Sequence, residues 1–209
     1  PWPLYPQRPG RFFIVMSNSS LWIGAAVAIV FFWGVGAYNR LVRLRAAVRA
    51  SFAVLDEQLM RQLVMVQASL PEAFRGGAKT APGELQDAVT AAWTRLQAAS
   101  DQFGAALAQA RRVNMDVASM ASLVMAHEAL RAAWTAALSE AVPTDAVPSA
   151  ERLQERWMRT LHQAMPLRAA FNEAANQYNL AIRAFPASMM AKGGGFAPVG
   201  SLSRMAEPR

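Results

Sequence analysis

The sequence predicts an all-α protein in which an N-terminal transmembrane helix is followed by a long-helix, antiparallel, up-down four-helix bundle. Three observations predict this fold: an apolar run near the N-terminus, apolar residues that recur at steps of three and four afterwards, and a composition rich in helix-forming residues. Alternating β-branched runs, which are typical of strands, are rare. The 209 residues are enough for one domain and an anchor.

The predicted transmembrane helix spans residues 20–38. No charged residue interrupts the run from Leu21 to Tyr38, LWIGAAVAIVFFWGVGAY, and its length suits a membrane-spanning helix. Trp22 lies near one end and Trp33 near the other, where aromatic side chains favour the membrane interfaces. A cleaved signal peptide is the alternative, but the long apolar core and the helical pattern that continues beyond it favour an anchor.

The segment before this helix, residues 1–19, is expected to be a disordered or misannotated N-terminus. Its first ten residues hold four prolines and show no helical pattern. Met16 stands just before a polar stretch and the apolar run, as a natural start would. We therefore expect residues 1–15 to be an upstream misreading of the gene or a fragment end.

A basic segment follows the apolar run. It contains Arg40, Arg43, Arg45 and Arg49, and the first acidic residue after it is Asp56. Positive charge beside a transmembrane helix favours the cytoplasmic side, so we expect a single-pass protein of the bacterial inner membrane with a cytoplasmic C-terminal domain. Anionic headgroups near the surface would add about 1 kcal/mol for each arginine. Fixing the topology is the minimal role of these residues.

Residues 39–186 carry four apolar stripes at helical spacing. The first stripe continues the membrane helix and ends at Pro71, before the GGAKTAPG loop. The second begins near Glu84. The residues of the four stripes are, in order, Leu41, Leu44, Val48, Phe52, Leu55, Leu59, Leu63, Val66 and Leu70; Leu85, Val89, Trp93, Leu96, Phe103 and Leu107; Val117, Met120, Val124, Leu130, Trp134 and Leu138; and Leu153, Trp157, Leu161, Met165, Phe171, Ala175, Tyr178, Ile182 and Phe185.

The second and third stripes are expected to belong to separate helices. Arg111-Arg112 suits a helix C-terminus, and Asn114 or Asp116 is a suitable start for the next helix. A single helix over residues 84–141 is the alternative, but at about 1.5 Å per residue it would extend far beyond its neighbours.

The fourth helix is expected after a proline-containing loop over residues 142–148. Ser149 is its expected cap, and Glu151 suits its first turn. Pro166 should kink it and Pro186 should stop it. Residues 187–209 are glycine-rich in part and are expected to form a flexible tail.

Two polar pairs are brought together by this connectivity. The first helix leaves the membrane and the fourth returns to it, so an up-down bundle places Tyr38-Asn39 near Tyr178-Asn179 at the membrane-proximal end.

Two stretches resemble the signatures of LemA proteins. The first, YNRLVRLRAAVRASFAVLDEQLMRQ, runs from the spanning helix through Tyr38 and Asn39 to Asp56, Gln58 and Arg61. The second holds two aromatic-asparagine pairs, then Phe-Pro and Gly-Phe; its residues are Phe171-Asn172, Tyr178-Asn179, Phe185-Pro186 and Gly195-Phe196. The resemblance implies an anchored all-helical bundle, and it implies no reaction because the family has no well-established enzymatic chemistry. The middle of the chain, from about residue 76 to 168, contributes almost nothing to it.

The chain departs from the family pattern at three positions. Gln62 stands where the family usually has a basic residue, Pro71 comes later than the usual proline, and Pro166 falls where unbroken helix is expected. These departures indicate a divergent member.

Catalytic and metal-binding motifs are not evident in the sequence. The chain has no cysteine and two histidines, His127 and His162, and neither belongs to an HExxH motif. Lys192 precedes three glycines, but their order is not that of a phosphate-binding loop, and no nucleophile elbow is found. We expect no enzyme activity, no cofactor and no metal. The net charge of +7 is spread along the chain without a nucleic-acid-binding motif, so no nucleic acid is expected as a partner.

The candidate interaction residues are those of the two signatures: Tyr38, Asn39, Asp56, Gln58, Asn172, Tyr178 and Asn179. They are interpreted either as a polar recognition patch or as a hydrogen-bond network that joins helices, and the network is favoured. The sequence thus predicts a membrane-anchored, non-catalytic scaffold or protein-interaction module with an unnamed protein partner or a second copy of itself. The alternative is a regulatory subunit or sensor of an envelope-stress or signalling system.

Overall fold

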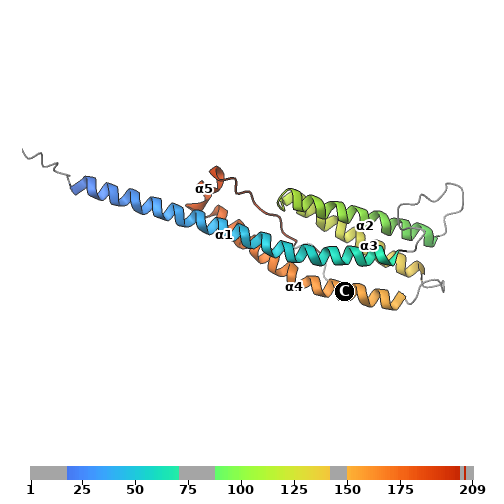
Figure 1. Ribbon diagram of the computed structural model, residues 1–209. Helices are drawn as coiled ribbons and strands as arrows, with labels where there is room; N and C mark the ends of the chain where they lie inside the picture. The colour runs from blue at the N-terminus through green and yellow to red at the C-terminus, as the bar shows by residue number, and fades with distance from the viewer. Residues whose placement is uncertain (1–17, 71–87, 142–149, 203–204, 206–209) are drawn as a thin grey trace, which may run out of the picture.

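The computed structural model describes residues 18–70, 88–141, 150–202 and 205, and all the regular structure in them is helical (Figure 1). The helices are α1 (Asn18–Ser69), α2 (Ala88–Arg112), α3 (Val117–Ala141), α4 (Ala150–Arg183) and α5 (Ala187–Gly193). The all-α prediction is confirmed. The expectations for residues 1–17, for the loop after Leu70 including Leu85, and for the loop that ends with the Ser149 cap lie outside the described residues.

Helix α1 continues without interruption across the predicted membrane boundary. It has 52 residues and contains no proline, so nothing in its sequence breaks the backbone hydrogen bonding. Its N-terminal half, from Leu21, is exposed, and the first fully buried side chain is Leu41. Among the described residues, α1 is the one helix that is long and apolar enough to cross a membrane. One rigid element therefore joins the apolar stretch to the packed core.

The helices pack most extensively as two pairs, α1 with α4 and α2 with α3 (Figure 1). Helices α1 and α4 run in opposite directions, because Trp33 contacts Phe185 at one end and the ring of Phe52 lies 5.5 Å from that of Phe171 further along. Contacts of α1 with α2 and of α3 with α4 join the two pairs. The N-terminal end of α1, ahead of the level of α5, projects beyond the other helices (Figure 1).

The core is formed by the predicted apolar stripes. Trp134 of α3 stacks on Trp157 of α4 with 5.1 Å between ring centroids, and Phe103 of α2 contacts the ring of His127 of α3. Among the stripe residues that the structure describes, most are buried, whereas Val117 and Phe185 are exposed. Each large apolar side chain that is fully buried contributes roughly 1.5–3 kcal/mol, so these stripes supply the main stabilisation.

The predicted break between the second and third helices is confirmed, and the alternative of one helix over residues 84–141 is wrong. Asn114 and Met115 adopt positive φ angles of 53° and 59°, which turn the chain out of the right-handed helix. Asp116 then caps α3, because its Oδ1 accepts a hydrogen bond from the backbone N–H of Ser119 at 2.8 Å.

Helix α4 runs through Pro166 to Arg183, with the expected acidic residue, Glu151, in its first turn. It ends three residues before Pro186, in agreement with the expected stop. The kink at Pro166 stays a prediction.

The segment after α4 differs from expectation. We expected a flexible tail over residues 187–209; instead, residues 187–193 form α5 and the chain then returns along the bundle with buried apolar side chains. The buried residues recur every three positions: Phe196, Val199, Leu202 and Met205. The glycines of this segment led to the expectation of flexibility. Its apolar residues at every third position are instead buried, and polar side chains of α4 bind its backbone.

Candidate functional site

The aromatic-asparagine pairs of α4 hold the C-terminal segment against the bundle. The side chain of Asn179 makes two hydrogen bonds with Val199: its Nδ2 donates to the carbonyl oxygen at 2.7 Å, and its Oδ1 accepts from the N–H at 3.0 Å. Two helical turns earlier, Oδ1 of Asn172 accepts from the N–H of Leu202 at 2.7 Å. The amides therefore replace the backbone partners that an extended segment lacks when its side chains are buried.

The same face of α4 continues the pattern in both directions. One turn before Asn172, the guanidinium of Arg168 donates to the carbonyl oxygen of Met205 at 2.9 Å. Towards the other end, the hydroxyl of Tyr178 donates to the carbonyl oxygen of Ala197 at 3.0 Å. Four side chains of one helix thus bind backbone groups of residues 197–202 and 205, which we call the C-terminal strap. The strap runs antiparallel to α4.

Gly200 brings the strap against the turn between α2 and α3. Its N–H donates to the carbonyl oxygen of Met115 at 3.0 Å. A Cβ atom at this position would lie 2.6 Å from Cβ of Met120 and 3.0 Å from Cα of Val117, so only glycine permits the close approach. The sequence analysis missed this residue, and a lone glycine in a glycine-containing tail offered no signal for it.

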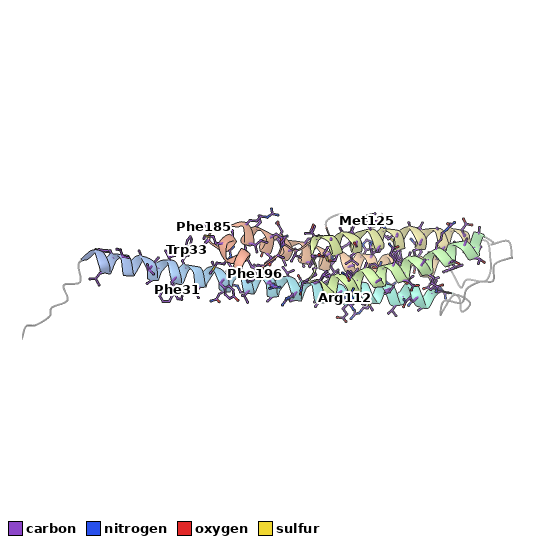
Figure 2. All side chains as sticks on the ribbon, turned by 90° about the horizontal axis from the view of Figure 1, so that it is seen from above. Phe31, Trp33, Arg112, Met125, Phe185 and Phe196 are labelled. Atoms are coloured by element: carbon purple, nitrogen blue, oxygen red, sulfur yellow. The ribbon has the colours of Figure 1, made fainter. Side chains whose placement is uncertain are left out.

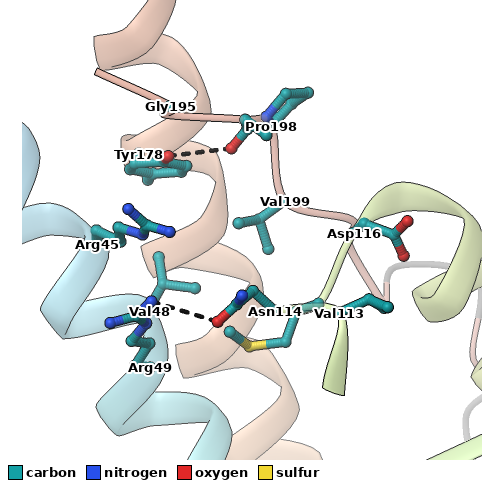
Figure 3. A pocket seen from close by; sticks show the side chains of 12 residues that line it. Arg45, Val48, Arg49, Val113, Asn114, Asp116, Tyr178, Gly195, Pro198 and Val199 are labelled. Carbon is teal, nitrogen blue, oxygen red and sulfur yellow. Dashed lines mark hydrogen bonds between the residues drawn. The ribbon is translucent and has the colours of Figure 1, made fainter. Parts of the chain in front are cut away.

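A pocket of about 200 Å³ lies where α1, the α2–α3 turn, α4 and the strap meet (Figure 3). Two arginines of α1 line it. Arg49 donates to Oδ1 of Asn114 at 3.3 Å, and the guanidinium carbon of Arg45 lies 5.6 Å from the centre of the Phe196 ring. This cation–π interaction between Arg45 and Phe196 is favourable, and it holds the side chain of Arg45 beside the strap.

The pocket carries charges of both signs and one aromatic hydroxyl. Burial raises the pKa of Tyr178, and the positive charges of Arg45 and Arg49 partly oppose this effect. Hydrogen bonds from Ser119 lower the pKa of Asp116, which is therefore a carboxylate near neutral pH. The pocket thus offers guanidinium donors, carboxylate and carbonyl acceptors, and a neutral phenol. This set can recognise a polar ligand or partner, and no nucleophile is poised next to a general base in it.

The first signature pair contributes unequally. The ring of Tyr38 meets that of Phe196 edge-on, with 5.8 Å between centroids, while Asn39 is exposed. The tyrosines of the two pairs meet adjacent residues, because Tyr38 contacts Phe196 and Tyr178 donates to Ala197. The proximity of Tyr38-Asn39 to Tyr178-Asn179 as pairs stays a prediction.

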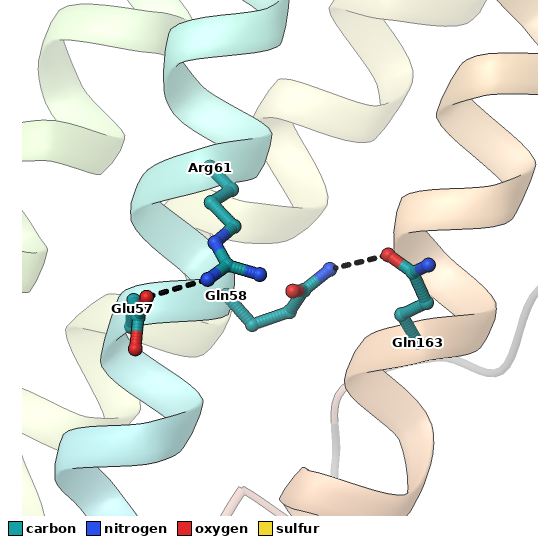
Figure 4. A network of polar contacts seen from close by, with 4 residues as sticks. All are labelled: Glu57, Gln58, Arg61 and Gln163. Carbon is teal, nitrogen blue, oxygen red and sulfur yellow. Dashed lines mark hydrogen bonds and ion pairs between the residues drawn. The ribbon is translucent and has the colours of Figure 1, made fainter.

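Asp56 and Gln58 join α1 to different neighbours. Oδ1 of Asp56 pairs with Nε of Arg111 at 2.7 Å, which links α1 to the end of α2. Nε2 of Gln58 donates to α4, to Oε1 of Gln163 at 3.2 Å and to the carbonyl oxygen of Thr160 at 3.3 Å (Figure 4). Both residues thus join helices, in agreement with the favoured network interpretation.

The four arginines of the basic segment separate into two groups. Arg40 and Arg43 are exposed near the start of the packed region, whereas Arg45 and Arg49 line the pocket. The run of arginines in the sequence gave no indication of this division, because it depends on which face of α1 meets α4.

The buried polar side chains Gln62 and His127 form a second feature, and the sequence did not indicate their burial. Gln62 is 1% exposed, and neither atom of its amide has a hydrogen-bond partner. His127 is also buried, and its Nδ1 lacks a partner. Burial lowers the pKa of His127 to about 4, and the charges of Arg131 and Arg168 lower it while Glu128 raises it. The cavity beside it measures about 20 Å³ and is too small for a ligand.

Within the residues that the structure describes, no three His, Cys, Asp or Glu side chains gather as a metal site would require. No protein-family model matches the chain, and neither a curated protein nor a solved structure is detectably similar to it.

Proposed function

We propose that this protein is a membrane-anchored, non-catalytic scaffold of the LemA type, an up-down bundle of four helices on a single-pass anchor. Its C-terminal domain lies on the cytoplasmic side of a bacterial inner membrane, and its pocket-bearing end binds a protein partner. One observation carries the proposal: α1 is a single helix whose exposed half is uncharged and apolar and whose other half belongs to the core.

The exposed half of α1 needs an apolar environment. Its large exposed side chains are Leu21, Trp22, Ile23, Val27, Ile29, Val30, Phe31, Phe32, Trp33 and Val35. An apolar surface of this extent is not stable in water, and a helix with this composition inserts favourably into a bilayer. Because the helix continues into the core, the membrane fixes the orientation of the bundle directly.

The family assignment rests on the two sequence signatures. Their supporting observation is that the late signature acts as one structural unit. Asn172, Tyr178 and Asn179 bind the strap, and Phe196 of the closing Gly-Phe pair packs beside Arg45 and Tyr38. The residues of this signature thus all help to hold the chain after α5 against α1 and α4.

The working surface is proposed at the pocket rather than at the asparagines. Asn172 and Asn179 are engaged with the strap, whereas Arg49 is exposed at the pocket edge. A partner segment that carries carboxylates would find the guanidinium of Arg49 within reach and would compete with Asn114 for it.

The anchorage is tested with matched valine substitutions on α1. Val27 and Val30 are 64% and 65% exposed in the apolar half, and Val54 and Val64 are 53% and 57% exposed in the bundle half. We expect Val27→Asp with Val30→Asp to release the protein from membranes at alkaline pH, because an aspartate inside a bilayer costs roughly 2.5–3.5 kcal/mol. Val54→Asp with Val64→Asp should leave it in the membrane pellet. Equal release of both double variants would contradict the anchor.

The partner-binding role is tested by crosslinking in native membranes and identification of the captured proteins. We expect a stoichiometric partner whose capture is lost in Arg49→Glu and kept in Arg61→Glu, since Arg61 is exposed on the same helix and pairs with Glu57 at 2.5 Å (Figure 4). Recovery of the protein alone from every variant would argue against a scaffold.

A further inference from the structure

The turn between α4 and α5 presents apolar side chains outward. Phe185 is 68% exposed, Met189 is 70% exposed and Met190 is 37% exposed. We call residues 184–191, with the sequence AFPASMMA, the apolar tip. Its helix α5 is too short to be stable by itself in water, and it exists here because it packs against α1 and α4.

The apolar tip lies beside the predicted membrane-spanning part of α1. The ring of Phe185 meets that of Trp33 with 5.4 Å between centroids (Figure 2). A Cβ atom on Gly34 would lie 3.8 Å from Cε of Met190. Trp33 precedes Tyr38, the last residue of the uncharged run, by about 7 Å along the helix axis at 1.5 Å per residue. The contacts of Phe185 and Met190 are therefore level with the end of the apolar stretch, and Arg40 of the basic segment lies beside the tip as well.

The backbone of the tip is suited to an apolar environment. The N–H of Ser188 donates to the carbonyl oxygen of Ala184 at 2.8 Å, and the N–H of Met189 donates to the carbonyl oxygen of Pro186 at 3.1 Å. At the end of α5, the N–H of Gly194 donates to the carbonyl oxygen of Met190 at 2.8 Å. Backbone groups that are paired within the protein do not need water, which is the condition for entry into lipid.

The charges flanking the tip match a membrane surface. No charged residue lies within residues 184–191, while Arg183 precedes them and Lys192 follows them in the sequence. An apolar segment with basic flanks is typical of elements that lie in the interface, where their apolar side enters about 5–10 Å below the headgroups.

An apolar cleft separates the tip from α1. It measures about 380 Å³, with Trp33, Gly36 and Ala37 on one wall and Ala184 and Phe185 on the other, and Arg40 lines it as well. In water such a cleft would expose apolar walls. In a bilayer, acyl chains would fill it, and Arg40 would reach towards the headgroups.

We propose that the apolar tip inserts into the bilayer interface beside α1 as a second point of membrane attachment, with lipid as its partner. This inference rests on the proposed membrane anchorage. It commits to lipid rather than to a second copy of the chain because the tip contacts the membrane-spanning stretch itself. Two points of attachment would hold the long axis of the bundle at a fixed angle to the membrane.

The test uses single-cysteine variants of the full chain, which contains no cysteine of its own. Met189→Cys reports on the tip. Met125→Cys, with 69% exposure on α3, is the matched control far along the bundle (Figure 2). Gly24→Cys reports on the anchor, because a side chain there meets no protein atom within 4 Å. Each variant is labelled with an environment-sensitive fluorophore and reconstituted into vesicles of phosphatidylcholine and phosphatidylglycerol that contain nitroxide lipids.

We expect the label at position 189 to be quenched about two-fold more strongly by a nitroxide near the headgroup than by one at the end of the acyl chain. The label at position 24 should be quenched by lipid nitroxides, and that at position 125 by neither. Quenching at 24 without quenching at 189 would overturn the inserted tip and leave the anchor intact. A blue-shifted but unquenched label at 189 would assign the tip to contact with a second copy. Absence of quenching at both 24 and 189 would overturn the anchorage itself.

Discussion

Asn179 shows how one side chain can support a segment without regular secondary structure. Its amide has a donor and an acceptor on one planar group, and it binds the N–H and the C=O of the same residue, Val199. Because Val199 is buried, both backbone groups would otherwise be withdrawn from water without partners. This polar residue of α4 thus supplies the hydrogen-bond partners that the backbone of Val199 would otherwise lack.

We expect Asn179→Ala to lower the free energy of unfolding by about 1–3 kcal/mol, since it leaves two buried backbone groups unpaired. The measurement is thermal or denaturant unfolding of the full chain in detergent micelles, followed by circular dichroism. Asn176→Ala is the control, because Asn176 is exposed on the same helix. Equal stability of both variants would show that the strap adds nothing to the fold.

The pocket also depends on single residues with unusual backbone geometry. Asn114 and Met115 both have positive φ angles, and the carbonyl of Met115 accepts the hydrogen bond from Gly200. Strained residues that several contacts hold in place are frequent at functional sites. The turn thus positions Asn114 for the hydrogen bond from Arg49, and the carbonyl oxygen of Met115 in the same turn accepts the hydrogen bond from the strap.

At the scale of elements, one face of α3 is buried, and this face carries a histidine that meets α2 and α4. His127 contacts the ring of Phe103 of α2 and lies beside a small cavity that Leu161 and Arg168 of α4 also line. The charged groups that act on it are Glu128 and Arg131 of α3 and Arg168 of α4. The folded state holds this imidazole neutral, because burial penalises its charged form.

This burial makes stability depend on pH in a definite direction. The pKa of His127 falls from its ordinary value of 6.5 to about 4 in the folded state, so the unfolded chain binds the proton more readily between these values. The contribution of the neutral imidazole to the free energy of unfolding is therefore fully present above pH 6.5 and is lost as the pH falls towards 4. The difference between a pKa of 6.5 and one of about 4 corresponds to a loss of at most roughly 3 kcal/mol in the free energy of unfolding.

We expect His127→Met to remove this part of the pH dependence, while His162→Asn, at an exposed position of α4, retains it. The measurement is the free energy of unfolding of each variant at several pH values from about 7 to about 4. An identical pH profile for wild type and His127→Met would show that the imidazole is not buried as described.

At the scale of the whole molecule, α1 defines the geometry. Its core half packs along α4, and its apolar half continues beyond the bundle in the same direction (Figure 1). The tip of residues 184–191 then packs against the apolar half, so that noncovalent contacts as well as the continuous helix join this half to the packed helices. A helix without an internal break transmits the orientation of one half to the other.

We expect the double variant Gly34→Cys with Met190→Cys to be joined by a short thiol crosslinker in native membranes. A Cβ atom on Gly34 lies within 4 Å of the Met190 side chain, and no other cysteine competes. Gly24→Cys with Met190→Cys should not be joined, because position 24 lies about 15 Å further along the helix. Efficient crosslinking of both pairs would indicate that α5 is not docked at this level of α1.

The sequence by itself determined the all-α class, the apolar helix and the residues of the core. The reason is local: the uncharged run and the spacing of Leu, Phe and Trp depend only on positions along one helix. The separation of α2 from α3 was also predictable, since Arg111-Arg112 and Asp116 are local signals for a helix end and a helix start. For Asp56 and Gln58, the sequence favoured a hydrogen-bond network over a recognition patch, but it did not indicate their partners.

Only the tertiary structure decided what the remaining site residues do. The asparagines of α4 bind a strap that follows the glycine run, which had indicated flexibility, and Gly200 is required by a contact with α3. The four arginines divide according to the face of α1 that they occupy. Each of these outcomes depends on atoms that are many residues apart in the chain. Local spacing carries no information about such contacts, because they exist only once the helices have packed.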